Sequence, residues 1–265
     1  MKKTLMLGNE AVARGLYEAG VTVVSSYPGT PSTEITENVV QYGDDVYCEW
    51  APNEKVAFEV AFGASTGGAR SFCAMKHVGL NVAADPLYTA SYIGVNAGMV
   101  CAVADDPGMH SSQNEQDSRH HAIAAKVPML EPSDSAECLA FTKLAYELSE
   151  QFDTPVLLRL STRISHSRSL VELSPREERP LKEYHKDVMK NVMMPAMARG
   201  AHVKVEKRTE ALRRWAETAS INTVEYNDKR IGIICAGTTY TYAKEALGER
   251  ASFLKLGMVN PLPVS

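Results

Sequence analysis

The sequence predicts an α/β protein with a mainly parallel β-sheet and helices on both of its faces. Short apolar segments rich in β-branched residues alternate with longer segments of helical periodicity. These apolar segments are hydrophobic throughout, as buried parallel strands are, and turn-forming residues follow them. Strands separated by helices indicate right-handed βαβ crossovers within one sheet.

Composition restricts the class of protein. The chain has 265 residues, of which 45% are hydrophobic and 23% charged, typical of a globular protein with one large or two ordinary domains. A net charge of −4 gives no electrostatic reason to expect nucleic acid or an anionic membrane as partner. No apolar run approaches the roughly 20 residues that span a bilayer, and the N-terminus does not resemble a signal peptide, so we expect a cytoplasmic protein.

The five cysteines show no metal-binding pattern. None forms a C-x-x-C pair, so the sequence encodes locally neither a zinc site nor an iron–sulfur cluster. We expect reduced thiols packed as small hydrophobic residues, and predict no metal ligands in this chain.

The first domain is predicted to cover residues 1–165. Its helices include 8–19, a helix with Thr30 as N-cap and Pro31 as first residue, a helix beginning near Pro52, and 134–152. The predicted strands are 21–25, 46–50, 71–75, 98–104, 128–130 and 155–160.

The second part of the chain has a different character. Residues 166–228 are charged and interrupted by proline, and we interpret them as a surface linker with a helix over 206–219. Residues 229–265 predict the start of a second α/β domain: a strand over 230–236, a helix ending near 247 and a strand over 251–259.

Glu54 is the candidate catalytic residue. It lies in the first turn of a helix that follows a predicted strand, and small residues, among them Ala57 and Ala61, line one face of that helix. The helix dipole alone favours an acidic residue there, by about 0.3–1 kcal/mol, which is the structural alternative. Glu59 points to a different face, so we assign it a surface or structural role.

Two polar loops follow predicted strands. Pro28 and Gly29 form a turn after the first strand, at the edge where open α/β sheets bind ligands. The loop 105–121 follows a fully apolar strand, and it is either part of a site or an ordinary solvated connection.

Several motifs in the same order resemble the N-terminal region of the alpha subunit of indolepyruvate ferredoxin oxidoreductase. The resemblance covers nearly all of residues 7–168 and resumes near the end of the chain. It implies the pyrimidine-binding domain of a thiamine-diphosphate-dependent enzyme, followed by a transketolase C-terminal-like domain. The motifs are SYPGTPSTEI, EWAPNEKVAFEVAFGAS, MKHVGLNVAADPL, VADDPGMHSSQNEQDSR, TPVLLRLSTRISHSR, GIICAGTTYTYAKEAL and LKLGMVNPLP.

The resemblance also implies roles for residues. Glu54 matches the glutamate that hydrogen-bonds N1′ of the aminopyrimidine and so promotes removal of the C2 proton of the cofactor. It further implies cofactor contacts by Pro28, Gly29, Thr30 and Asn81, and substrate contacts by Thr30, His77, His110 and Arg119. Asp105 and Asp106 stand where pyruvate-oxidising relatives carry a substrate-binding arginine, so that contact is not transferred. In the alternative interpretation, Asp117 and Arg119 only organise the loop.

The motif that holds magnesium and the diphosphate, G-D-G…N-N, does not occur in the sequence. The resemblance therefore implies a partner domain that supplies it, and iron–sulfur clusters in other parts or a beta subunit. It also implies ferredoxin as electron acceptor, coenzyme A as co-substrate, and a homo- or hetero-oligomer.

The expected function is oxidative decarboxylation of an arylpyruvate, with indolepyruvate first, to an acyl-CoA. Alternatives are a related thiamine enzyme for another 2-oxoacid, or a non-catalytic α/β module. A hydrolase using His110, Ser111 and Ser112 is disfavoured because the sequence lacks a G-x-S-x-G elbow.

Overall fold

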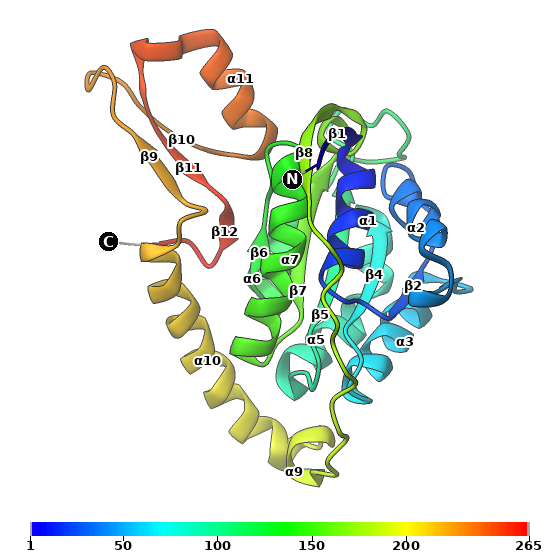
Figure 1. Cartoon of the computed structure of the whole chain (residues 1–265). Coiled ribbons are helices and arrows are strands. Elements are labelled where there is room, and N and C mark those ends of the chain that lie inside the picture. The colour runs from blue at the N-terminus through cyan, green and yellow to red at the C-terminus, as the bar shows by residue number, and fades with distance from the viewer. Residues whose placement is uncertain (1, 264–265) are drawn as a thin grey trace.

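A computed structural model, which describes residues 2–263, has a seven-stranded sheet as its centre (Figure 1). The strand order is β12-β6-β7-β5-β4-β2-β3, and every neighbouring pair is parallel except β12 with β6. The predicted, mainly parallel sheet is thus confirmed. The strands of this sheet are β2 (Val23–Ser26), β3 (Tyr47–Trp50), β4 (Ser71–Lys76), β5 (Met99–Asp105), β6 (Met129–Leu130), β7 (Val156–Ser161) and β12 (Met258–Asn260).

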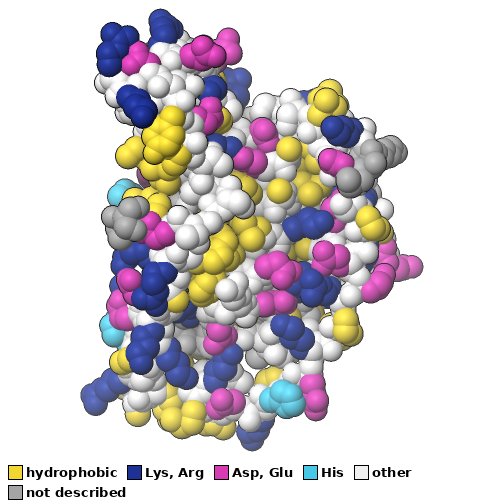
Figure 2. All heavy atoms as spheres, turned by 60° about the vertical axis from the view of Figure 1, so that its left-hand side comes forward, with side chains coloured by type: hydrophobic (Ala, Val, Ile, Leu, Met, Phe, Trp, Pro, Cys, Tyr) yellow, Lys and Arg dark blue, Asp and Glu magenta, His cyan; other side chains and the backbone are white. Residues whose placement is uncertain are grey.

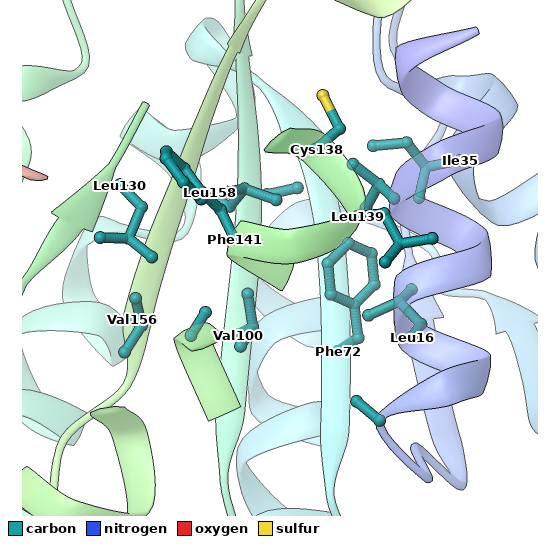
Figure 3. Close-up of a cluster of buried hydrophobic side chains, with 14 of the residues drawn as sticks. Leu16, Ile35, Phe72, Val100, Leu130, Cys138, Leu139, Phe141, Val156 and Leu158 are labelled. Carbon is teal, nitrogen blue, oxygen red and sulfur yellow. The ribbon is translucent and has the colours of Figure 1, made fainter. Parts of the chain in front are cut away.

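Helices cover both faces of the sheet, as predicted. One layer packs on a core that contains Leu16, Ile35 and Phe141 (Figure 3), and the other on a core that contains Phe58 and Leu80. The first layer consists of α1 (Gly8–Glu18), α2 (Thr33–Val39) and α7 (Ser135–Phe152). The second consists of α3 (Glu54–Thr66), α4 (His77–Val82), α5 (Ala84–Ile93) and α6 (Arg119–Ala125).

Strand β5 shows why its sequence is apolar throughout. Val100 and Ala102 enter the first core, whereas Cys101 and Val103 enter the second, and all of them are fully buried. Successive side chains of a strand point to opposite faces, so a strand covered on both sides needs apolar residues at every position.

Two helices begin later than predicted. Ser32, rather than Thr30, is the N-cap of α2, and Pro31 precedes it. Helix α3 begins at Glu54, because the Asn53 side chain accepts a hydrogen bond from the Val56 N–H (3.0 Å) and caps the helix. Pro52 therefore lies outside the helix.

The segment after residue 165 contains more regular structure than predicted. Strand β8 (Arg168–Leu173) pairs antiparallel with β1 (Lys2–Leu7), and neither strand was predicted. Helix α8 (Thr162–His166) precedes β8, and α9 (Val188–Asn191) and α10 (Pro195–Thr218) follow it. Helix α10 starts eleven residues before the predicted helix over 206–219.

The stretch between β8 and α9 runs along the body of the protein (Figure 1). The Arg176 guanidinium donates to the carbonyls of Tyr17 (2.9 Å) and Val21 (3.0 Å). The backbones of Gly68 and Lys182 also meet, since the Lys182 N–H donates a hydrogen bond to the Gly68 carbonyl (2.9 Å). Gly68 has φ +100°, and a Cβ there would lie 1.9 Å from the Lys182 carbonyl oxygen, so only glycine fits.

The last part of the chain forms a lobe. Helix α11 (Gly237–Leu247) packs on a small sheet of order β10-β11-β9, and Figure 2 shows this lobe projecting from the body. Its strands are β9 (Thr223–Glu225), β10 (Gly232–Ala236) and β11 (Ser252–Leu256), and 3-10 turns occur at Val40–Asp45 and Gly248–Arg250.

The prediction of a single strand over 251–259 is wrong. Strand β11 ends before Gly257, and the residues after it form β12, which joins the central sheet. A Cβ at Gly257 would lie 2.6 Å from the Ile221 carbonyl oxygen, so glycine lets the chain pass between the lobe and the body.

All five cysteines are free thiols, and four are buried. Burial is the main cause that raises the pKa of the half-buried Cys48 to about 11, with the Glu49 carboxylate as a second cause. Within residues 2–263, no helix combines the length and the apolar character needed to cross a membrane.

Truncating a core side chain tests the packing of the first layer. Phe72 on β4 is fully buried, so Phe72→Ala should lower the free energy of unfolding by about 3–5 kcal/mol. Leu181→Ala, at a side chain that is 68% exposed, should change it by less than about 0.5 kcal/mol. Urea unfolding followed by circular dichroism measures both values, and equal losses would contradict the described core.

Candidate functional site

The candidate site lies at the carboxyl edge of the central sheet. The strands β3, β2, β4, β5, β7 and β6 are parallel neighbours in this order, so the loops after them meet at one edge. Neighbouring strands lie about 4.8 Å apart, so the six loops that follow these strands are close together along the edge.

Glu54 lies at the β3 end of the edge. Its side chain is half-buried, and among residues 2–263 the carboxylate has no hydrogen bond or ion pair. The side chain presses against Gly79 of α4, where a Cβ would lie 2.5 Å from Glu54 Oε1. A carboxyl group held this closely and left without a protein partner is free to hydrogen-bond a ligand.

Two contacts bring other loops to the end of β4, which leads into the helix α4 that Glu54 touches. The loop after β2 passes the end of β4, where a Cβ on Gly29 would lie 3.4 Å from the Lys76 side chain. The Lys76 ammonium donates to the Ser111 carbonyl (2.8 Å), which holds the loop after β5 over the same strand end. Pro28 and Thr30 are exposed in this loop, so their backbone and side chains face solvent at the edge.

His77 is fully buried at the start of α4. Its Nε2 lies 3.1 Å from the Asn114 carbonyl oxygen, and a carbonyl only accepts, so Nε2 carries the proton. In the neutral ring Nδ1 is then a buried acceptor, and it has no partner among the described residues. Asn81, one turn further along α4, is exposed, and its Oδ1 lies 3.0 Å from His121 Nε2.

The side chains of the two remaining predicted residues have other neighbours. His110 is exposed and lines a cavity at the ends of β5 and β7. Arg119 lies near the end of β6, where its guanidinium pairs with Glu131 (3.0 Å) and Asp117 (3.3 Å). These ion pairs support the alternative in which Arg119 organises the loop.

Sequence reasoning missed a buried charge cluster in the middle of the edge. Arg159 on β7 is 8% exposed and pairs with Asp105 (2.8 Å) and Glu131 (2.8 Å). Burial alone lowers the pKa of Arg159, but the carboxylates of Glu131, Asp105 and Asp117 raise it above its usual value. An arginine within an otherwise apolar strand, PVLLRL, was the available signal, because a buried charge needs a partner.

Asp106 is a further buried acid that sequence reasoning did not single out for a structural role. Its carboxylate accepts from the Thr162 hydroxyl (2.7 Å), the Ser111 N–H (2.7 Å) and the Ser112 hydroxyl (2.8 Å). Burial raises the pKa of Asp106, but these hydrogen bonds and one from the His110 N–H lower it to about 2. The loop after β5 is thus fixed by a charged group.

The described part of the chain contains no group of three or more His, Cys, Asp or Glu side chains arranged to hold a metal ion.

Comparison with known families identifies the chain. Residues 14–227 match the family model described as pyruvate flavodoxin/ferredoxin oxidoreductase, thiamine diphosphate-binding. The chain belongs to this family. The chain is also similar to individual proteins. One is the indolepyruvate oxidoreductase subunit IorA of Archaeoglobus fulgidus, which is 44% identical over 99% of this chain. IorA of Methanothermobacter thermautotrophicus is 46% identical over 98% of this chain.

The chain spans 44% of the length of each of these two relatives. A solved structure also shares its fold: 2-oxoglutarate:ferredoxin oxidoreductase from Magnetococcus marinus, with 2-oxoglutarate, coenzyme A and succinyl-CoA bound. The TM-score is 0.80 at 19% identity, and the match covers 99% of this chain and 55% of the other. The predicted fold class is therefore confirmed for this member of the family.

Asp106 makes the stability of the domain depend on pH. A carboxyl group with a folded-state pKa of about 2 and an ordinary value of 3.8 stabilises the fold above pH 4, and this contribution is lost as pH falls towards 2. Asp106→Asn should therefore lower the free energy of unfolding by about 2 kcal/mol at pH 7, with a smaller difference near pH 2.

Asp44→Asn, at an exposed aspartate without a hydrogen-bond or ion-pair partner among the described residues, serves as control and should leave the pH profile unchanged. Urea unfolding at several pH values between 2 and 7 measures the profiles. A constant difference between wild type and Asp106→Asn across this range would contradict the hydrogen-bonded role of the carboxylate.

Proposed function

We propose that the chain is the pyrimidine-binding part of a thiamine-diphosphate-dependent 2-oxoacid:ferredoxin oxidoreductase that acts on arylpyruvates. Family membership supports the cofactor, and the two IorA relatives support indolepyruvate as substrate. The single structural observation that carries the proposal is the half-buried Glu54 carboxylate, which has no donor within residues 2–263.

The residues around Glu54 fit an aminopyrimidine ring. The ring needs a carboxyl group to hydrogen-bond its N1′ atom, and Glu54 is free to do so. Gly79 permits the close approach of that carboxylate to α4, because any side chain there would displace it. The exposed turn at Pro28, Gly29 and Thr30 would contact the bound cofactor, and Asn81 would lie at its margin.

When bound, thiamine diphosphate supplies the carbanion chemistry that decarboxylates a 2-oxoacid. The contribution of this chain is to hold and exchange a proton through Glu54 at N1′, and to orient the ring at the strand edge. His77, with its buried acceptor Nδ1, and the Thr30 hydroxyl are the residues that we assign to the substrate side.

The geometry supports the proposal over a non-catalytic module. A solvent-exposed Glu54 away from the strand ends would have favoured such a module, whereas the observed Glu54 is half-buried at the edge, against Gly79. Arg119 is not assigned to the substrate, because its guanidinium pairs with Glu131 and Asp117. His110 is not assigned to it either, because its side chain lines a cavity at the ends of β5 and β7.

The same proposal requires, for activity, parts of the enzyme that lie outside this chain. A diphosphate-binding domain with magnesium, a beta subunit and iron–sulfur clusters would complete the enzyme, with ferredoxin as acceptor and coenzyme A as acyl acceptor. We propose the domain arrangement 1–165 for pyrimidine binding, 166–228 as connection and 229–265 as the start of the next α/β domain, in the cytoplasm.

Replacing Glu54 tests the proposed proton role. In the assembled enzyme, Glu54→Gln should lower indolepyruvate-dependent reduction of a viologen, with coenzyme A present, by about 10²–10⁴-fold. Glu59→Gln serves as matched control on the same helix, because Glu59 is exposed and lies 4.0 Å from Lys55, and it should retain activity. Full activity in Glu54→Gln would remove the proposed role. Pyruvate or 2-oxoglutarate outperforming indolepyruvate would redirect the substrate assignment.

The isolated chain should show no measurable binding of thiamine diphosphate by calorimetry, with or without magnesium. The physical reason is that the ring contact alone is expected to be too weak without the domain that holds the diphosphate. Tight magnesium-dependent binding to residues 1–265 would show that the diphosphate is held within this chain.

A further inference from the structure

Residues 113–116, in the loop after β5, lie between two fixed points. On one side, the Ser112 hydroxyl donates to the buried Asp106 carboxylate (2.8 Å). On the other side, Ser118 donates its N–H (3.1 Å) and its hydroxyl to the buried Asp105 carboxylate. Both carboxylates lie at the carboxyl end of β5, so the segment between the two serines is attached to the body at both of its ends.

Few contacts hold the segment itself. Residues 113–116 belong to no helix or strand, and within residues 2–263 none of their backbone groups pairs with another backbone group. The side chains of residues 113–115 are exposed, and the Glu115 carboxylate accepts from the Gly108 N–H (2.7 Å) of the same loop. A segment with exposed side chains and few backbone hydrogen bonds has low local stability.

This segment covers His77. The histidine is fully buried, and its Nε2–H donates to the Asn114 carbonyl (3.1 Å), so an exposed segment encloses a buried ring. Gly79, two residues further along α4, touches Glu54, so the covered ring belongs to the same end of the sheet edge as Glu54. A ligand at this edge reaches His77 only if the Asn114 carbonyl moves away from Nε2.

The contact with Asn114 satisfies only one of the two ring nitrogens of His77. Nδ1 is buried, and it has no partner among the described residues. In the neutral ring Nδ1 is an acceptor, and a buried acceptor without a donor costs free energy that contact with water would recover. The covered state therefore gains a hydrogen bond at Nε2 and loses hydration at Nδ1, which keeps the free-energy cost of uncovering the ring small.

We propose that residues 113–116 form a flap that opens to expose His77 and is held closed by the hydrogen bond between His77 and Asn114. When the flap opens, the Nε2–H loses the Asn114 carbonyl and becomes a donor for an oxygen of the 2-oxoacid carboxylate. The flap thereby controls access to the site, as mobile loops of enzymes do. The identity of this ligand rests on the proposed function, whereas the movement of the flap does not.

Acylation of histidine by diethyl pyrocarbonate, located by mass spectrometry, tests the flap on the 265-residue chain. The reagent acylates an imidazole nitrogen that solvent reaches. In wild type, His77 should react at least about tenfold more slowly than His185, whose side chain is 79% exposed, because His77 reacts only in the open state.

Removing the contact between the flap and the rest of its loop should favour the open state. Glu115→Ala deletes the acceptor of the Gly108 N–H and should raise the acylation rate of His77 about three- to tenfold. Glu178→Ala makes the same substitution at an exposed glutamate without a hydrogen-bond or ion-pair partner among the described residues. It should leave the rate at the wild-type value.

Phe72→Ala separates opening of the flap from unfolding of the whole chain. It destabilises the core but leaves every contact of the flap in place, so His77 should react at the wild-type rate. Three outcomes would overturn the flap. They are equal acylation of His77 in wild type and Glu115→Ala, a wild-type His77 as reactive as His185, and a faster reaction of His77 in Phe72→Ala than in Glu115→Ala.

The assembled enzyme tests the ligand. After treatment with the reagent, Glu115→Ala should lose indolepyruvate-dependent viologen reduction faster than wild type, and hydroxylamine, which removes the acyl group from imidazole, should restore it. Equal inactivation of the two enzymes despite different acylation of His77 would overturn the assignment of His77 to the 2-oxoacid. An assembled enzyme inactive with every 2-oxoacid would contradict the proposed function, whereas the acylation rates on the chain decide the flap independently.

Discussion

Parallel hydrogen bonding between six strands is the constraint on which the rest of the structure depends. Because β3, β2, β4, β5, β7 and β6 run in one direction, every loop that leaves a strand end reaches the same edge. Residues as distant in sequence as Gly29, Glu54 and His77 are thereby collected, and the helices on both faces bury the apolar strands that keep this register. The position of the candidate site follows from the direction of the strands.

The charges at this edge have two different roles. Arg159 and Asp105 are buried and paired, so removing either one would leave the other without compensation, and they hold the loops in place. Glu54, at the β3 end of the same edge, has no described partner. The paired charges thus hold the loops in place, and the Glu54 carboxylate is left unpaired beside them.

Periodicity was sufficient for the regular parts of the fold. It placed the strands of the central sheet from β2 to β7 within two residues, since a strand buried on both faces must be apolar throughout. It failed where contacts distant in sequence decide the structure. Strands β1 and β8 form only because they pair with each other, and Gly257 breaks an apolar run because the chain passes against Ile221. For the candidate site, the sequence predicted Glu54, whose role stays a prediction. It could not show that Arg119 would be paired with Glu131, which lies on another segment.

The return of β12 to the central sheet gives the lobe two attachments. The chain enters the lobe after α10, whose Leu212 and Ala216 are buried in the body, and leaves it through β12, beside β6. Asn222 joins the two crossings, because its Oδ1 accepts from the N–H groups of Gly257 (2.9 Å) and Met258 (3.1 Å). The two adjacent crossings, together with the ion pair between Lys255 of β11 and Glu137 of α7, fasten one end of the lobe to the body.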